Sequence, residues 1–315
     1  MSESRELRFD VATALSVGQR DHQEDAVVTD FAYGTDSGFA VLADGMGGHA
    51  AGDVASKLVV TEVFSALKFG TEDPDTFSEQ AAEILLDAAR IANESVRMHM
   101  EGNPDTEGMG STLLAPVIVN SQLYWISVGD SPLYLFREGR LYQLNDDHSL
   151  APQIDLMAAQ GLIEPEVARN HPDRNALTSV LFGEAIPQVD CPEEPFELEP
   201  GDILVMASDG LQFLSNSEIS ALLRARGRRS SADIVQTLLT ALEKLEDPEQ
   251  DNVSICIVKV GLKGEIMERR PPSRPIMLES EEVQPEGKGV SLAERLRIAR
   301  RRFFQKPAAF ALGGR

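Results

Sequence analysis

Acidic residues stand beside several strongly apolar segments of this sequence, and their spacing suggests metal chemistry. The segment FAVLAD ends in Asp44, YWISVGD ends in Asp130, DILVMASD ends in Asp209, and Asp251 stands just before VSICIVKV. We expect the apolar segments to be strands, which would bring the four carboxylates to one rim of the sheets. Clustered carboxylates repel one another unless a cation neutralises them. Oxygen ligands without paired Cys or His suit Mg²⁺ or Mn²⁺ better than Zn²⁺.

Each of these carboxylates also has a simpler explanation. An Asp-Gly step after a strand is a common turn, and any one of these sites taken alone is more readily explained that way. Glycine beside the acid lets the backbone bend sharply and can offer a carbonyl oxygen at close range. Only the four sites together favour the metal interpretation.

A second candidate lies near the start, in VGQRDHQEDA. Arg20 can hold a phosphate through two parallel hydrogen bonds, for which Lys offers only a point charge. Glu24 and Asp25 follow it closely and could ligate a metal and orient its water. The alternative is a polar loop with a local ion pair.

The elements that must position these residues are short strands and a few long helices. We predict strands over residues 7–17, 26–31, 38–43, 111–119, 123–128, 133–137, 140–144, 202–207 and 253–260. We predict helices over residues 52–68, 76–100, 217–225 and 231–245. Strands come in runs, then helices, then strands again, which favours an α+β layered fold over βαβ alternation. The polar stretch 147–176 is long for a connection, and such connections are usually functional.

Composition excludes several classes of protein. The 315 residues carry a net charge of −22, with an isoelectric point near 4.6. Nucleic acid binding rests on cationic contacts to phosphates, so we expect no nucleic acid partner. The two cysteines, Cys191 and Cys256, form no CxxC motif and suggest neither a disulfide framework nor a zinc site. No secretory signal pattern or membrane-spanning run is evident, so we expect a cytoplasmic protein.

Charge and composition change near Val260. Residues 1–260 hold 17 Lys and Arg against 44 Asp and Glu, whereas residues 261–315 hold 12 against 7. We therefore predict a main domain over 1–260, a Pro/Glu-rich linker over 261–290 and a basic amphipathic tail over 291–315. Ser291 and Glu294 form a capping-box pattern at the start of that tail. Such a helix could lie on an anionic membrane surface or dock on the acidic body, and the alternative is a disordered solubilising tail.

Six short motifs occur in an order that resembles a known family. They are Gly18-Gln19-Arg20 with Glu24-Asp25, Asp44-Gly45-Met46-Gly47-Gly48-His49, Gly110-Ser111-Thr112, Gly129-Asp130-Ser131, Ser208-Asp209-Gly210 and Asp251-Asn252. Together they resemble the metal-dependent Ser/Thr protein phosphatases (type 2C, or PPM) in their bacterial form, over roughly residues 8–260. Each motif alone is weak, but six in the right order are a specific signal.

The resemblance implies a four-layer α-β-β-α sandwich with two antiparallel sheets and a metal centre at one end. It implies two Mn²⁺ or Mg²⁺ ions, with Asp44 bridging them. Asp209 and Asp251 would complete one metal site, and Glu24 with the Gly45 carbonyl the other. The remaining implied roles are a water held by Asp25, a third metal site at Asp130 and Asp209, and a substrate phosphate bound by Arg20.

The implied activity is hydrolysis of phosphoserine and phosphothreonine in proteins. Two close cations lower the pKa of a shared water, and the resulting metal-bound hydroxide would attack the phosphorus. Arg20 and the metals would stabilise the charge on the equatorial oxygens. The implied partners are phosphorylated proteins, including a Ser/Thr kinase and its targets, and we expect a monomer. The stretch 147–176 corresponds to the flap that influences substrate choice in this family.

Two departures from the family pattern stand out. Met46 replaces the His that animal members carry as the suggested general acid, and we expect His49 to be structural rather than to take over that role. Pro132 replaces an Arg that relatives often have. Two other functions remain open: a catalytically silent phosphoprotein-binding module, which should have lost metal ligands, and a phosphoesterase for small molecules.

Overall fold

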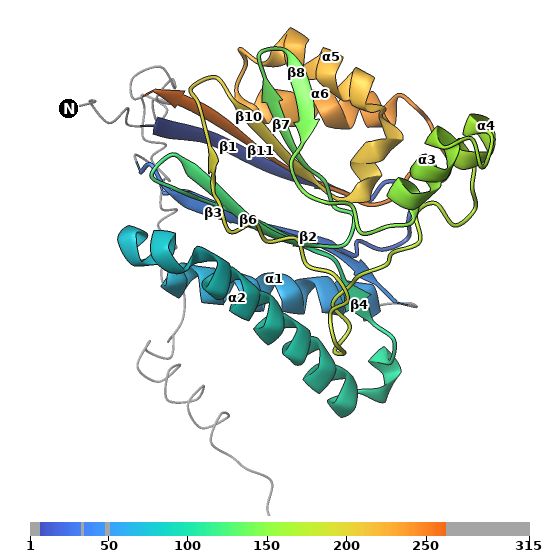
Figure 1. Ribbon diagram of the computed structural model, residues 1–315, viewed down its shortest axis with the longest axis horizontal. Helices are drawn as coiled ribbons and strands as arrows, with labels where there is room; N and C mark the ends of the chain where they lie inside the picture. The colour runs from blue at the N-terminus through green and yellow to red at the C-terminus, as the bar shows by residue number, and fades with distance from the viewer. Residues whose placement is uncertain (1–6, 33–34, 48–50, 263–315) are drawn as a thin grey trace, which may run out of the picture. The chain divides into compact units, whose positions relative to one another are not determined.

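The chain folds as two stacked β-sheets with helices on their outer faces (Figure 1). This computed structural model describes residues 7–32, 35–47 and 51–262. The whole described part belongs to one compact unit of the chain, residues 1–268. Every strand pairing is antiparallel, which confirms the predicted α+β layered fold.

Among the residues that the structure describes, the first sheet has five strands and the second has six. The first runs in the order β1 (Leu7–Ser16), β11 (Val253–Leu262), β10 (Ile203–Ala207), β7 (Leu133–Arg137) and β8 (Arg140–Gln143). The second runs in the order β2 (Asp25–Asp30), β3 (Gly38–Met46), β5 (Leu113–Val119), β6 (Gln122–Val128) and β9 (Phe196–Glu197), and β4 (Gly110–Ser111) pairs with β3. β1 and β2 are therefore edge strands of their sheets.

Two pairs of helices cover the two outer faces. Helices α1 (Ala51–Gly70) and α2 (Pro74–Gly102) pack on the second sheet, and α5 (Asn216–Arg226) and α6 (Ser231–Glu243) pack on the first. Their starts carry the expected caps: Asp73 at α2, a Ser215–Glu218 capping box at α5, and Ser230 at α6. Two short helices, α3 (Ala151–Ala159) and α4 (Pro165–Arg169), lie together in the region of the predicted flap.

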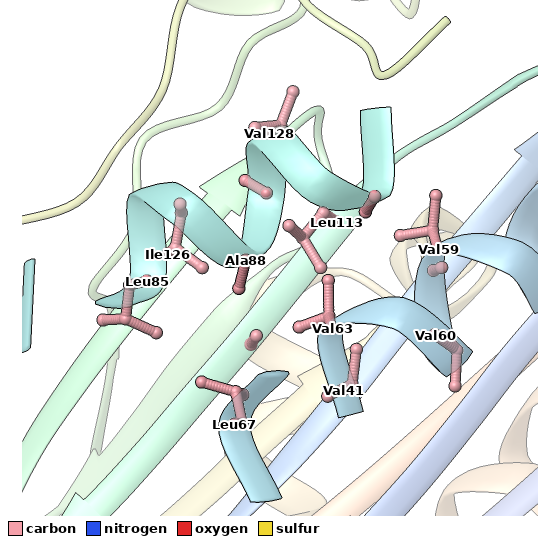
Figure 2. Packing of buried hydrophobic residues seen from close by; sticks show 14 of the residues in the cluster. Val41, Val59, Val60, Val63, Leu67, Leu85, Ala88, Leu113, Ile126 and Val128 are labelled. Atoms are coloured by element: carbon pink, nitrogen blue, oxygen red, sulfur yellow. The ribbon is translucent and has the colours of Figure 1, made fainter. Parts of the chain in front are cut away.

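Three apolar layers hold the sandwich together. One lies between α1, α2 and the second sheet, where Figure 2 shows Val63 and Leu67 of α1 beside Leu85 and Ala88 of α2 above strand residues such as Val41. A second lies between α5, α6 and the first sheet, and a third lies between the two sheets. Leu85 recurs with Ala81, Ala88, Ala92 and Val96 at the helical spacing seen in the sequence, and all of these side chains are buried.

The layer between the sheets explains where the acidic residues lie. Side chains alternate along a strand, so Ala40, Leu42 and Asp44 of β3 share one face. Ala40 and Leu42 belong to the inter-sheet core, and Asp44 is the next residue of that row. On β10 and the residue after it, Leu204, Met206 and Ser208 form the matching row of the other sheet. The inter-sheet layer is therefore apolar along most of its length and polar at one end.

Some predicted elements differ from the structure. The stretch 147–176 contains α3 and α4, which its polar, Gly- and Pro-punctuated sequence did not reveal. Asp44 and Gly45 lie inside β3, which continues to Met46, so the turn interpretation of this Asp-Gly step is wrong. The predicted strand 111–119 is two strands, β4 and β5, interrupted at Thr112. β9, with only two residues, has no sequence pattern of its own.

The C-terminal predictions fall on residues outside those described. β11 runs to Leu262, two residues beyond the predicted end of the main domain. The linker over 261–290 and the tail over 291–315 remain predictions, as does the role of His49. In the described part of the chain, no helix is both long and apolar enough to cross a membrane.

Candidate metal centre

The predicted acidic residues come from five different strand ends and meet at the polar end of the inter-sheet layer. Asp25 is the first residue of β2 and lies directly opposite Asp44 of β3 in the antiparallel register. Asp209 follows β10 and opens a 3₁₀ turn, residues 209–213, and Asp251 precedes β11. Like charges directly opposite on neighbouring strands are destabilising, so this pairing needs a compensating group.

Asp25 is buried and only half satisfied by hydrogen bonds. Its Oδ2 accepts a hydrogen bond of 2.7 Å from the Ser208 hydroxyl, whereas its Oδ1 is buried without a partner. Burial, together with the charges of Asp209 and Asp251, raises the pKa of Asp25 to about 7, despite the hydrogen bond from Ser208. Such a group is stable as a carboxylate only when a positive charge is close.

Burial and charge repulsion also act on Asp44 and Asp209. Burial raises the pKa of Asp44 well above its usual value, and the neighbouring charges of Asp25 and Asp209 add to this. Burial and the charge of Asp251 raise the pKa of Asp209 to about 6, and its Oδ1 is also buried without a partner. Unpaired buried oxygens in such a cluster are typical of ligands for a hard cation.

The residues present fit a divalent cation centre, although they do not form a closed cage. Within the described residues, no three acidic, His or Cys side chains already converge on a single point. The carboxylates nevertheless repel one another, and two of their oxygens are buried without a hydrogen-bond partner. These two observations favour a cation site more strongly than the incomplete convergence of the side chains argues against one. The donors are all oxygens, which agrees with Mg²⁺ or Mn²⁺.

Glu24 and the Gly45 carbonyl lie together at the start of α1. A Cβ on Gly52 would lie 2.7 Å from Glu24 Oε1 and 2.8 Å from the Gly45 carbonyl oxygen, so both oxygens face the same point on the first turn of the helix. Burial raises the pKa of Glu24, and Arg20 partly opposes this. The two oxygens assigned together to one metal site from the family resemblance are thus neighbours. Gly52 lets the helix approach them, and the sequence reasoning did not identify it.

Asn252 and Thr112 position these ligands. Asn252 Oδ1 accepts a 2.7 Å hydrogen bond from the Glu24 backbone N–H, and its Nδ2 donates to the backbone carbonyls of Val17 and His22. The Thr112 hydroxyl accepts a 2.9 Å hydrogen bond from the Asp44 backbone N–H. Both residues belong to the quoted motifs, but their side-chain roles could not be inferred without the fold.

Arg20 lies beside the cluster. Its Nη2 donates a 2.6 Å hydrogen bond to Asp251 Oδ2, and its side chain is 56% exposed. Arg20 does form an ion pair, but the pair is not local. Its partner is Asp251, far away in sequence, and not Glu24 or Asp25. An exposed guanidinium fixed next to a buried carboxylate cluster is placed to meet an incoming anion.

Asp130 lies at the edge of the same cluster. Burial raises its pKa to about 8, and the charges of Asp209 and Asp147 contribute. The preceding residue, Gly129, donates its N–H to His148 Nδ1 at 3.1 Å and accepts from the His148 N–H at 3.1 Å. Asp147 and His148 were not among the predicted site residues.

The two departures from the family pattern have structural outcomes. Met46 ends β3 and is only partly buried. Pro132 is buried, and its carbonyl accepts a 3.2 Å hydrogen bond from the Ala207 N–H. This places Pro132 at the junction of β7 and β10.

Comparisons with known proteins identify the family of the chain. A family model described as protein phosphatase 2C matches residues 17–250. The serine/threonine phosphatase Stp of Listeria welshimeri is 33% identical over 223 residues, covering 70% of this chain and 84% of that protein. The serine/threonine protein phosphatase PstP of Mycobacterium tuberculosis is also 33% identical, over 230 residues that cover 71% of this chain and 37% of PstP.

Solved structures give the same result. The crystal structure of Mycobacterium tuberculosis PstP/Ppp is 31% identical, with a TM-score of 0.65, covering 81% of this chain and 98% of that one. A structure of the PstP catalytic domain in complex with two manganese ions is 30% identical, with a TM-score of 0.63, covering 81% and 99%. Sequence and fold comparisons thus agree, and the chain belongs to the protein phosphatase 2C family.

Proposed function

We propose that this chain is a metal-dependent protein phosphatase that hydrolyses phosphoserine and phosphothreonine in proteins. The observation that carries the proposal is the cluster of buried and half-buried, mutually repelling carboxylates in a chain of the protein phosphatase 2C family. We propose two Mn²⁺ or Mg²⁺ ions as its cofactors, as in the manganese complex of the PstP catalytic domain. When bound, such ions lower the pKa of a shared water to supply the hydroxide nucleophile and neutralise phosphate charge.

The ligand roles are those that the family resemblance implies. Asp44, on which the charges of Asp25, Asp209 and Asp251 act, would serve both ions, with Asp209 and Asp251 on one side. Glu24 and the Gly45 carbonyl would be ligands of the other ion, and the absence of a side chain on Gly52 leaves room for these two oxygens. Asp130, close to Asp209, would serve a third ion.

Asp25 and Arg20 act on water and substrate. The Ser208 hydroxyl fixes Asp25 Oδ2, which leaves Oδ1 to accept a hydrogen bond from a water molecule and so orient it. Arg20 would bind two phosphate oxygens and hold the phosphorus in line for attack, which is an effect of positioning and of charge. To do this it must exchange its contact with Asp251 for the phosphate. The leaving serine or threonine oxygen then needs a proton, which solvent at this open rim can supply.

The partners belong to this proposal. Phosphoproteins would be the substrates, and a Ser/Thr protein kinase with its targets would be the source of them. The helices α3 and α4 stand where the flap was predicted. The Arg174 guanidinium holds this region through two hydrogen bonds of 2.7 Å to Asp155 on α3.

The decisive experiment compares phosphopeptides with phosphorylated metabolites, each with Mn²⁺, with Mg²⁺ and with a chelator. We expect hydrolysis of phosphoserine and phosphothreonine peptides that requires the metal. Binding of phosphopeptides without hydrolysis would indicate a silent binding module, and a preference for metabolites would indicate a small-molecule phosphoesterase. The Arg20→Ala variant should raise KM and lower kcat for peptides together, while calorimetric metal affinity changes little.

A further inference from the structure

A groove of about 430 Å³ opens beside the metal centre, between the edge strands of the two sheets. We call it the β1–β2 groove. Leu15 of β1, Ala26 and Val27 of β2, and Asp53 and Lys57 of α1 line it. Gln23, His22 and Asp25 form its end nearest the carboxylate cluster.

The groove is a continuation of the inter-sheet core that the sheets leave open. The odd-numbered residues of β1 face the other sheet, and Leu7, Phe9 and Val11 pack in the inter-sheet layer. Leu15 belongs to the same row but is 48% exposed. Val17, two residues further along the same row, is 43% exposed, so the row continues as apolar surface at the edge of the sheet. Contiguous apolar surface of this kind marks binding sites more often than a single exposed side chain does.

The groove and the metal centre are continuous. Asp25 lines the groove and also belongs to the carboxylate cluster. Gln23 fixes the junction, because its Nε2 donates 3.1 Å to the Ser16 carbonyl of β1 and its Oε1 accepts 3.1 Å from the Asp25 N–H of β2. One side chain thus ties the two sheet edges together where the groove meets the site.

The lining points to an apolar occupant. Leu15, Ala26 and Val27 supply aliphatic surface. The only Lys of the lining, Lys57, forms a 2.6 Å ion pair with the half-buried Asp53. No unpaired Lys or Arg therefore remains among the lining residues to select an acidic side chain.

We propose that the β1–β2 groove is a specificity subsite that takes an aliphatic side chain near the phosphorylated residue of the substrate. Val27 lies two residues along β2 from Asp25, which is about 7 Å at the rise of a strand. An extended substrate peptide with its phosphate at the cluster therefore places the side chain two positions away over Val27 and Leu15. This inference rests on the proposed function and adds to it the recognition of a neighbouring Leu, Ile, Val or Met.

The test uses the full-length protein and three phosphoserine peptides of otherwise equal sequence. One has Leu two positions before the phosphoserine, one has Leu two positions after it, and one has Gly at both. We expect one leucine peptide to show a kcat/KM about tenfold above the glycine peptide. This preference should fall to about unity in Leu15→Ser, and in Leu15→Trp, which fills the groove. p-Nitrophenyl phosphate, which has no flanking residues, measures the metal centre in every variant.

Phe69→Ser is the matched control. Phe69 is 71% exposed near the far end of α1, about 24 Å from Asp53 at the rise of a helix, and the variant should keep the leucine preference. Thermal unfolding of each variant reports whether it is folded. Equal kcat/KM for the three peptides in the wild type, or a leucine preference that survives in Leu15→Ser, overturns the subsite. If the wild type is a dimer and Leu15→Ser is a monomer, the groove contacts a second copy of the chain, and the subsite is overturned. Loss of activity on all substrates in the wild type would contradict the proposed function itself.

Discussion

The layer between the two sheets has an apolar interior and a polar end, and the same strands build both. On β3, Leu42 closes the interior, and Asp44, two residues on, faces the polar end. On β10 and beyond, Met206 is apolar and Ser208 is polar. The interior is stabilised by burial, whereas the end is destabilised by burial, because its charges repel one another without water to screen them.

This difference shows how a stable sandwich can support a strained site. Packing of the apolar rows fixes the strands, and the fixed strands determine where the carboxylates at their ends lie. The Ser208 hydroxyl donates to a carboxylate, and the Asn252 and Thr112 side chains accept from the backbone N–H groups of the ligand residues, which fixes the site further. The site therefore has its ligands gathered before any cation binds, and the binding free energy of the cation offsets the repulsion.

The largest expected effect comes from neutralising one ligand. Asp209→Asn removes a charge that repels Asp44 and Asp251, but it also removes a metal ligand. We expect phosphatase activity to fall at least about 100-fold. The fold should persist, because the surrounding strands are apolar. Activity with Mn²⁺ and the circular dichroism spectrum of the purified variant check both statements, and full activity would contradict the assignment of the metal centre.

The second prediction compares two positions of one strand. Leu42→Ala leaves a cavity in the interior and should lower the free energy of unfolding by about 2–5 kcal/mol. Asp44→Asn removes a buried charge two residues away, and should leave the metal-free protein equally stable or more stable. Urea unfolding in the presence of a chelator measures both. If both substitutions lowered the free energy of unfolding equally, the polar end would be stabilised by burial as the interior is, which would contradict the comparison.

The third prediction concerns pH. In the unfolded chain the Asp carboxyls ionise near pH 4. In the folded, metal-free protein the pKa of Asp25 is raised to about 7 and that of Asp209 to about 6. The folded state therefore holds protons that the unfolded state releases. Stability should be greatest below about pH 4 for these groups and should fall as pH rises to about 7.

We expect the free energy of unfolding to fall by on the order of 3 kcal/mol over this range. The shifts of Asp25 and Asp209 are not added, because the repulsion between these two carboxylates contributes to the raised pKa. Thermal unfolding in a chelator between pH 5 and 8 should show the fall, and Mn²⁺ should reverse it at the upper end. Asp44→Asn provides the control, since it should flatten the profile. A metal-free protein that gains stability over this range would contradict the raised pKa values.

Much of this could be predicted from the sequence, and the rest has physical reasons. The row of Ala81, Leu85, Ala88 and Val96 predicted α2, because a buried helix face has a strong period. Four of the acidic residues were identified because each stands beside an apolar run: Asp44, Asp130, Asp209 and Asp251. Helices α3 and α4 were missed because they bury only Ile154 and Ala168, so they leave almost no periodic pattern.

The parts of the site that could not be predicted depend on contacts between distant segments. Asn252 contacts Glu24 across 228 residues, and Thr112 contacts Asp44 across 68. Asp147 approaches Asp130 only because the reciprocal hydrogen bonds of His148 and Gly129 fold the chain back. Spacing along the sequence contains no signal for such pairs. Gly52 is the clearest case, because its role depends on the absence of a side chain.

Gly52→Ala is the smallest of the expected effects and tests how tightly the polar end is built. The added methyl group would lie 2.7 Å from Glu24 Oε1 and 2.8 Å from the Gly45 carbonyl oxygen. Glu24 is a side chain and can rotate away, whereas the Gly45 carbonyl is backbone within β3 and cannot. One metal site should therefore lose the Glu24 oxygen, and α1 must shift away from the Gly45 carbonyl. Metal affinity measured by calorimetry should fall about tenfold. Thermal stability in a chelator should also fall slightly, because the helix propensity gained with Ala does not remove the contact with the backbone carbonyl. Gly102→Ala at the end of α2, where nothing lies within 4 Å of the added carbon, is the matched control and should leave metal affinity unchanged. If both variants bind Mn²⁺ as the wild type does, then Glu24 and the Gly45 carbonyl do not form a metal site, and the polar end is confined to Asp25, Asp44, Asp209 and Asp251.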